Sequence, residues 1–194
     1  MVTETNEQPQ HLSLYVPGKP VAQGSTRAFL TKSGRPIVTG SNPGGVAAFR
    51  LDVIEAVRRA RDLSPTSTPG EWDPMFAAKV GIWVDIVFSF ERPKAHYGTG
   101  RNSTVKKEHA PDCHTSKPDI DKLSRAALDA LTIARVFHDD SAVAGLTVAK
   151  TYADIAHTFI NVQPLRVDPL DAARRATSIT HPNPAERSER NTTS

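Results

Sequence analysis

The sequence predicts an α+β fold in which one mixed β-sheet packs against two main helices. Residues 79–90 alternate apolar and polar side chains, as a half-buried strand does. Two other segments, 43–63 and 119–134, repeat apolar residues at helical spacing. Their order along the chain is strand, helix, strand, helix, strand, strand, which favours a sheet layered against helices.

Four segments are expected to form the strands. The first, at 12–16, alternates leucine and valine with polar residues and is closed by the prolines and glycine of VPGKP. The second, at 79–90, has Val80, Ile82, Val84, Ile86, Phe88 and Phe90 on one face. LTVAKTY at 146–152 and HTFINV at 157–162 are expected to be two antiparallel strands that turn around 153–156.

The two helices carry different boundary signals. Asn42 followed by Pro43 predicts a capped start for the first helix, whose apolar side includes Phe49, Val53 and Val57. The second helix is expected over about 119–134 and is apolar at Ile120, Leu123, Ala127, Ala130, Leu131 and Ala134.

The chain length of 194 residues predicts one globular domain, at 11–165. Residues 1–10 and 166–194 are expected to be disordered, apart from a short helix at about 168–176. The sequence has no apolar run of about 18 residues, its start is polar and acidic, and Cys113 is its only cysteine. A cytoplasmic protein without a membrane partner is the expectation.

The basic residues gather in two segments rich in glycine and proline. One includes Lys19, Arg27, Lys32 and Arg35, and the other is the long connection at 91–118, with six lysines and arginines and three histidines. Connections of this length inside a compact domain are usually functional or disordered. Basic loops suit the phosphates of nucleic acids, although charge alone fits a solvated surface better.

Two aspartates, Asp119 and Asp121, stand where the second helix is expected to begin. Acids at a helix start are favoured by capping and by the helix dipole, which is a structural interpretation. Asp121, Arg125 and Asp129 also share one helical stripe. This stripe is either a surface ladder of ion pairs, or a site in which Asp121 binds a cation, Arg125 grips a phosphate and Asp129 orients Arg125.

A second acidic pair, Asp139 and Asp140, follows the same helix. Adjacent aspartates favour a turn, but they also supply the hard oxygen ligands that Mg²⁺ prefers. A site shared by both pairs requires that the chain after 134 folds back along the helix, or that the pairs meet across a dimer. The fold-back within one chain is the arrangement we favour from sequence.

The stretches KPDIDKLSRAALDAL, FHDDSAV and VAK within 117–150 resemble the signature of the RusA-like Holliday junction resolvases, an endodeoxyribonuclease family common in phages and prophages. This resemblance implies a homodimer, Mg²⁺-dependent cleavage of four-way DNA junctions, and catalytic aspartates at Asp119, Asp121 and Asp140. Two positions depart from the family pattern, which usually has asparagine at Lys122 and lysine at Arg125. Arginine can fork onto a phosphate but cannot donate a proton.

We therefore predict a Mg²⁺-dependent, structure-selective DNA endonuclease, with Mn²⁺ as an alternative ion. Asp119, Asp121 and Asp140 are predicted metal ligands and catalytic residues, Asp139 is an auxiliary ligand, and Arg125 is a catalytic phosphate contact. The predicted DNA-binding residues are Arg27, Arg35, Lys106, Lys107, Lys117 and Lys122.

Three other interpretations compete with this one. A DNA- or junction-binding protein without catalysis would need the basic loops but not the acids. A nuclease for other branched DNA would need both. A zinc site at His109, Cys113 and His114 lacks a fourth ligand, and a glycosyltransferase with an Asp-x-Asp motif would need a larger nucleotide-binding domain.

Overall fold

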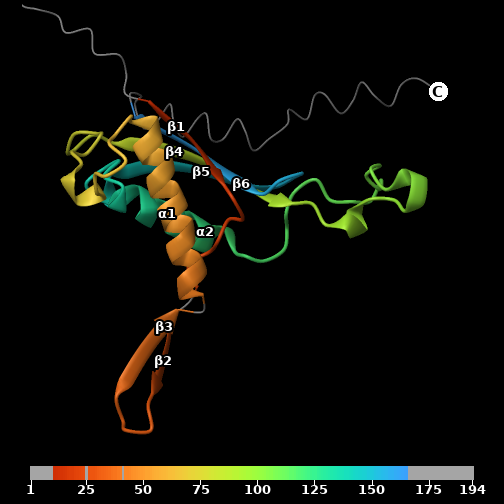
Figure 1. Ribbon diagram of the computed structural model, residues 1–194, viewed down its shortest axis with the longest axis horizontal. Helices are drawn as coiled ribbons and strands as arrows, with labels where there is room; N and C mark the ends of the chain where they lie inside the picture. Colours follow the sequence, from red (N-terminus) through yellow and green to blue (C-terminus); the bar gives the residue numbers. More distant parts are fainter. Residues whose placement is uncertain (1–10, 25, 41, 166–194) are drawn as a thin grey trace, which may run out of the picture. The chain divides into compact units, whose positions relative to one another are not determined.

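The computed structural model describes residues 11–24, 26–40 and 42–165, with the backbone alone at 26–30 and 36–40. The predictions for residues 1–10 and for the tail at 166–194 lie outside the described residues. Within the described part, the predicted α+β class is confirmed, because a mixed four-stranded sheet is joined by two main helices (Figure 1).

The main sheet has the strand order β1-β6-β4-β5. Its strands are β1 (Leu12–Pro17), β4 (Ile82–Glu91), β5 (Val143–Ala153) and β6 (His157–Pro164). β4 pairs in parallel with β5 and antiparallel with β6, and β6 pairs antiparallel with β1. The only parallel pair is therefore β4 with β5 among the described strands, and α2 lies in the chain between them.

The predicted pairing of the last two strands is wrong. β5 and β6 run in opposite directions, as expected, but β4 lies between them in the sheet. The connection at 154–156 crosses the end of β4, where the backbone amide of Arg92 donates to the carbonyl oxygen of Ala153. The short connection between β5 and β6 correctly predicts that these strands run in opposite directions. Their pairing partner is β4, which forms long backbone hydrogen-bond ladders with both of them.

A hairpin replaces the loop that was predicted at 26–40. β2 (Thr26–Leu30) and β3 (Pro36–Gly40) pair antiparallel as a separate two-stranded sheet. The turn between them is closed by the amide of Thr31 donating to the carbonyl of Arg35, and Gly34 has a φ of +76°. That positive φ favours glycine over residues with a Cβ atom.

Both main helices contact the sheet as well as each other. α1 (Pro43–Ala60) packs on β1 and α2, and α2 (Ile120–Ile133) packs on α1 and β5. The side chain of Asn42 caps α1 by accepting from the amide of Gly45 at 3.1 Å. Together with one face of the sheet, the helices bury a single core that includes Leu14, Val16, Val53, Val57, Ile86, Phe88, Leu123, Leu131 and Ile160.

The end of α2 is fixed by a left-handed residue. Arg135 has a φ of +55°, and the amide of Val136 donates to the carbonyl of Leu131 at 3.0 Å. This is the Schellman arrangement that ends many helices. Four short 3₁₀ helices complete the described elements, namely Pro69–Glu71, Lys94–His96, Gly100–Asn102 and Asp140–Ala142. No helix in the described ranges is long and apolar enough to cross a membrane.

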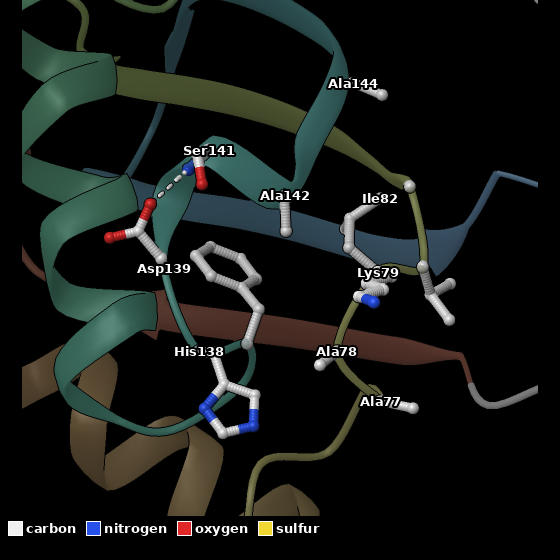
Figure 2. A pocket seen from close by; sticks show the side chains of 12 residues that line it. Ala77, Ala78, Lys79, Ile82, His138, Asp139, Ser141, Ala142 and Ala144 are labelled. Atoms are coloured by element: carbon white, nitrogen blue, oxygen red, sulfur yellow. Dashed lines mark hydrogen bonds between the residues drawn. The ribbon is translucent and has the colours of Figure 1, made fainter.

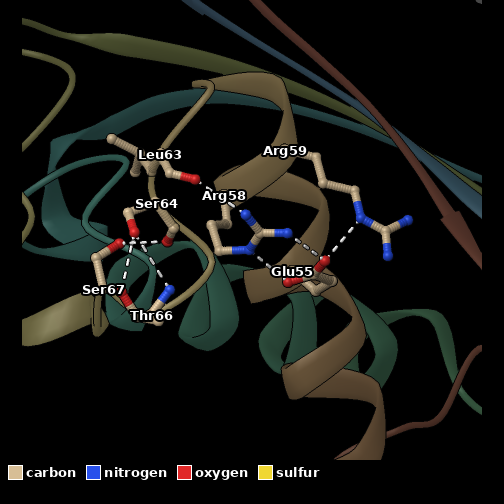
Figure 3. Close-up of polar contacts among 7 residues, drawn as sticks. All are labelled: Glu55, Arg58, Arg59, Leu63, Ser64, Thr66 and Ser67. Atoms are coloured by element: carbon tan, nitrogen blue, oxygen red, sulfur yellow. Dashed lines mark hydrogen bonds and ion pairs between the residues drawn. The ribbon is translucent and has the colours of Figure 1, made fainter.

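One acid near the end of α1 organises two arginines (Figure 3). Glu55 accepts a fork of two hydrogen bonds from Arg58 and a third from Arg59, each at 2.6–2.7 Å. Arg58 also donates to the carbonyl of Leu63, which holds the chain beyond the helix. The hydrogen bonds from Arg58 and then Arg59 lower the pKa of Glu55 to about 2.

This pKa predicts an acid-dependent change in stability. The folded pKa of Glu55 lies below its ordinary value of 4.5, so the stabilisation is complete above about pH 4.5 and is lost as pH falls toward 2. Glu55→Gln should therefore reduce the fall in melting temperature between pH 5 and pH 2. Glu108→Gln, at an exposed glutamate, serves as the control. An unchanged pH dependence in Glu55→Gln, measured by circular dichroism, would contradict this assignment.

Candidate active site

The first candidate acid, Asp119, begins α2. Its backbone is extended, its carbonyl accepts from the amide of Leu123, and its side chain makes no capping hydrogen bond with the helix. The carboxylate instead accepts from the ammonium of Lys122 at 2.9 Å. Asp121 follows in the first turn and is exposed. Both carboxylates are therefore exposed at the N-terminal end of α2, and the Asp119 carboxylate is not used to cap the amides of the helix.

The surroundings of Asp119 are positive. The hydrogen bond and the charge of Lys122 lower the pKa of Asp119, and the charges of Lys117 and Lys150 act in the same direction. Asp119 is consequently ionised at neutral pH. An ionised, exposed carboxylate is available to a cation, but a cation must compete with Lys122 for it.

Of the two interpretations of the stripe Asp121, Arg125 and Asp129, the structure does not show the one in which Asp129 orients Arg125. Its carboxylate accepts from Arg50 of α1 at 2.6 Å, and both side chains are about 30% exposed, at 29% and 30%. Asp129 thus ties α2 to α1 and does not orient Arg125. Arg125 is exposed one turn beyond Asp121, which leaves its guanidinium facing solvent.

The long connection after β4 is fastened to the edge of the sheet. Cys113 forms an isolated bridge with Thr151 of β5, and the side chain of Arg92 donates to the carbonyl of Pro111 at 2.7 Å. The backbone of Cys113 therefore belongs to the edge of the sheet. No group of three or more metal-binding side chains occurs among the described residues.

The basic residues predicted to bind DNA differ in whether their side chains already have a hydrogen-bonding partner in the structure. Lys106 pairs with Asp112 at 2.5 Å, and Lys107 donates to the carbonyl of Ala95 at 2.9 Å. Arg35 is exposed in the turn between β2 and β3, and Lys117 is exposed beside Pro118. Arg27 lies on β2, where only the backbone is described.

The second acidic pair lies in a different part of the fold. Asp139 caps the short 3₁₀ helix Asp140–Ala142 by accepting from the amide of Ser141 at 2.9 Å. Hydrogen bonding from the side chain of Ser141, and then from its amide, lowers the pKa of Asp139. Asp140 is exposed. Asp139 lines a hollow of about 400 Å³. Figure 2 shows Asp139 on one side of this hollow, with Lys79 and Ile82 on the other.

The two acidic pairs are at opposite ends of α2 and β5. The ammonium of Lys150 on β5 donates to the carbonyl of Pro118, next to Asp119, whereas Asp140 precedes the start of β5 at Val143. Val143 and Lys150 are seven residue steps apart along the strand, which is about 23 Å. The fold-back that we favoured from sequence is therefore not what the structure shows, because Asp140 does not join Asp119 and Asp121 within one chain.

The residues at the head of α2 fit a magnesium ion in part. Mg²⁺ commonly takes only one or two carboxylates from a protein and completes its octahedron with water and substrate phosphate. Asp119 and Asp121 supply two exposed carboxylates, and the hard oxygen donors are of the right kind. A third carboxylate at this point would have to come from elsewhere.

Sequence reasoning gave no role to Lys150, although the VAK stretch was noted. Its ammonium contacts two carbonyls of the segment before Asp119, at 2.7 and 2.8 Å. The only signal in the sequence was a lysine on the face of a strand where apolar residues alternate. The contact itself depends on the β4–β5 pairing, which the sequence did not predict.

The site combines exposed carboxylates with neighbouring lysines and arginines, in a protein of the α+β class. Metal-dependent enzymes that cut nucleic acids have such sites. A comparison with protein families identifies the class more closely. Residues 17–163 match the family described as Endodeoxyribonuclease RusA, and the chain belongs to that family. The family resemblance noted at 117–150 is thus confirmed, and the protein is an endodeoxyribonuclease of the Holliday junction resolvase type. A search of curated proteins found no match.

The ion pair between Lys122 and Asp119 gives a testable consequence for cation binding. Lys122→Asn removes a competing ammonium 2.9 Å from a predicted ligand, so the affinity for Mn²⁺ should rise about two- to fivefold, as expected for an exposed ion pair. Free Mn²⁺ can be followed by electron paramagnetic resonance in the absence of DNA. Weaker Mn²⁺ binding in the variant would argue against Asp119 as a ligand.

Proposed function

We propose that this endonuclease is Mg²⁺-dependent, and that it resolves four-way DNA junctions by paired phosphodiester hydrolysis in recombination and repair. The observation that carries the proposal is the exposed pair Asp119 and Asp121 at the head of α2, surrounded by Lys117, Lys122 and Arg125. Carboxylates in such a position would repel DNA unless a cation lies between them and the phosphate. A protein that only binds DNA gains nothing from this arrangement.

The side chains at this site would divide the work. Asp119 and Asp121 would hold the metal ion, which when bound lowers the pKa of a water molecule and neutralises charge on the phosphate. Arg125 would bind the phosphate from its exposed position one helical turn beyond Asp121. Arg125 cannot donate the proton that the leaving oxygen needs, so that proton would come from water.

DNA arms would be held mainly through phosphates, with contacts that carry no sequence information. The residues we propose for this are spread over the β2–β3 hairpin, the connection after β4 and the head of α2, namely Arg27, Arg35, Lys106, Lys107, Lys117 and Lys122. Lys106 and Lys122 would exchange their present carboxylate partners for phosphate oxygens. Binding should therefore weaken steeply as salt is raised.

A homodimer would supply the carboxylate that a single chain lacks. β5 lies at an edge of the main sheet, and among the described residues its outer side is paired at Lys150 and Thr151 with His114 and Cys113. Antiparallel pairing of two β5 strands about a point between Leu146 and Thr147 would put Val143 of one copy beside Lys150 of the other. Asp140 of one copy would then approach Asp119 and Asp121 of the second, with Asp139 as an auxiliary acid.

Replacement of Asp121 separates an enzyme from a binder. Asp121→Asn should abolish cleavage of a synthetic four-way junction, because a metal ligand is lost, while binding stays equal or becomes tighter as one repelling charge is removed. Cleavage and gel-shift assays at one stated salt concentration measure both, with duplex and single-stranded DNA as comparison substrates. Cleavage equal to that of the unchanged protein, or insensitive to chelator, would refute the proposal.

The proposed dimer edge can be tested by cross-linking. In a Cys113→Ser background, Leu146→Cys combined with Thr147→Cys should form a covalent dimer under mild oxidation, because in this register residue 146 of one copy lies directly opposite residue 147 of the other. Ser13→Cys places the thiol on β1, at the opposite edge of the sheet, and should not do so. Sedimentation of the unmodified protein as a monomer, or cross-linking through Ser13→Cys alone, would rule out pairing through β5.

A further inference from the structure

Lys150 lies on β5, opposite Phe88 of β4, with a half-buried side chain. Its ammonium donates to the carbonyl of Ser116 at 2.7 Å and to that of Pro118 at 2.8 Å. Both acceptors belong to the short segment that leads into Asp119. One side chain from the sheet therefore holds two carbonyls of the backbone just ahead of a predicted metal ligand.

The main chain of Lys150 contacts the same segment. Its carbonyl accepts from the amide of His114 at 3.3 Å, and the adjacent Thr151 bridges Cys113. The imidazole of His114 stacks on Phe90, with ring centroids 4.0 Å apart. Residues 113–118 are thus held at one end by backbone pairing with β5 and by aromatic packing on Phe90 of β4, and at the other end by the ammonium of Lys150.

The first turn of α2 is also contacted by the backbone amide of Gln23, which donates to the carbonyl of Lys122 at 3.0 Å, but that bond does not come from the sheet. The carboxylate of Asp119 caps none of the helix amides, and it bonds to Lys122, which is itself on the helix. That ion pair moves with α2 and cannot hold the helix start against the sheet. The connection from the sheet to the backbone just before Asp119 is made by Lys150.

We propose that Lys150 is a positioning residue, which sets the place of the Asp119 carboxylate relative to Asp121 by holding the carbonyls of Ser116 and Pro118. The inference rests on the proposed function, because it assumes that Asp119 is a metal ligand. The ammonium of Lys150 bonds to backbone carbonyls and not to either aspartate. Two carbonyl acceptors satisfy an ammonium by hydrogen bonding without neutralising it, so its charge also favours the ionised carboxylate nearby.

The test measures Mn²⁺ binding to the full-length protein without DNA, by electron paramagnetic resonance. Lys150→Met removes both hydrogen bonds and should weaken Mn²⁺ affinity by about 10- to 100-fold, as loss of an outer contact to a metal ligand does. Lys150→Arg keeps a charged donor and should stay within about threefold of the unchanged protein. Arg59→Gln removes the same charge from an exposed site on α1 and should leave Mn²⁺ affinity unchanged.

A second readout reports on the backbone itself. Amides of residues 114–123 should exchange hydrogen for deuterium faster in Lys150→Met than in the unchanged protein, in the absence of metal. If Lys150→Met does not fold, Lys150→Gln keeps two donors without charge and should show the same changes at smaller size. Equal Mn²⁺ affinity and equal exchange in the folded variants would overturn the role of Lys150.

The outcomes distinguish this inference from the function on which it rests. If the unchanged protein binds Mn²⁺ and cleaves a junction, while Lys150→Met binds Mn²⁺ equally well, only the positioning role is refuted. If the unchanged protein neither binds Mn²⁺ nor cleaves in its presence, the proposed function is refuted and Lys150 has no metal ligand to position.

Discussion

The parallel pairing of β4 with β5 is the constraint on which the rest of the structure depends. Parallel neighbours need a crossover, and α2 supplies it, so the helix must run back against the direction of both strands. The head of α2 therefore lies at the carboxyl ends of these strands, and its end lies at their beginning. This direction puts Asp119 and Asp121 at the carboxyl ends of β4 and β5, and Asp140 at the opposite ends of these strands.

The same constraint explains where the charged groups gather. The connection at 92–118 begins at the carboxyl end of β4 and comes back to the sheet at Cys113, which bridges β5. It then leads directly into α2, so its basic residues lie in the segment that precedes the head of this helix. In open α/β sheets, ligands commonly bind beyond the carboxyl ends of the strands. The aspartates at the head of α2 and the lysines of the connection meet there because the topology brings both segments to the same ends of the strands.

Much of the fold followed from local patterns in the sequence. The alternation at 79–90, the Asn42 cap and the apolar periodicity at 119–134 each report local structure, and each element is present. The pairing of the strands could not be predicted from local patterns, because β5 and β6 both pair with β4, which lies far away in sequence. The roles of Asp129 and Lys150 were missed for the same reason, since Arg50 and Pro118 are distant along the chain. Whether Asp140 could lie near Asp119 and Asp121 in one chain depended on the parallel direction of β4 and β5, which the sequence did not predict.

The central claim is that one metal site takes Asp119 and Asp121 from one copy and Asp140 from another. Co-expression of Asp121→Asn with Asp140→Asn tests it directly, because each mixed dimer would contain one site with all its aspartates. Each variant alone should be inactive on a four-way junction. The mixture should recover nicking, from about a quarter of the wild-type number of sites if the copies associate at random. A mixture as inactive as either variant alone would contradict the claim.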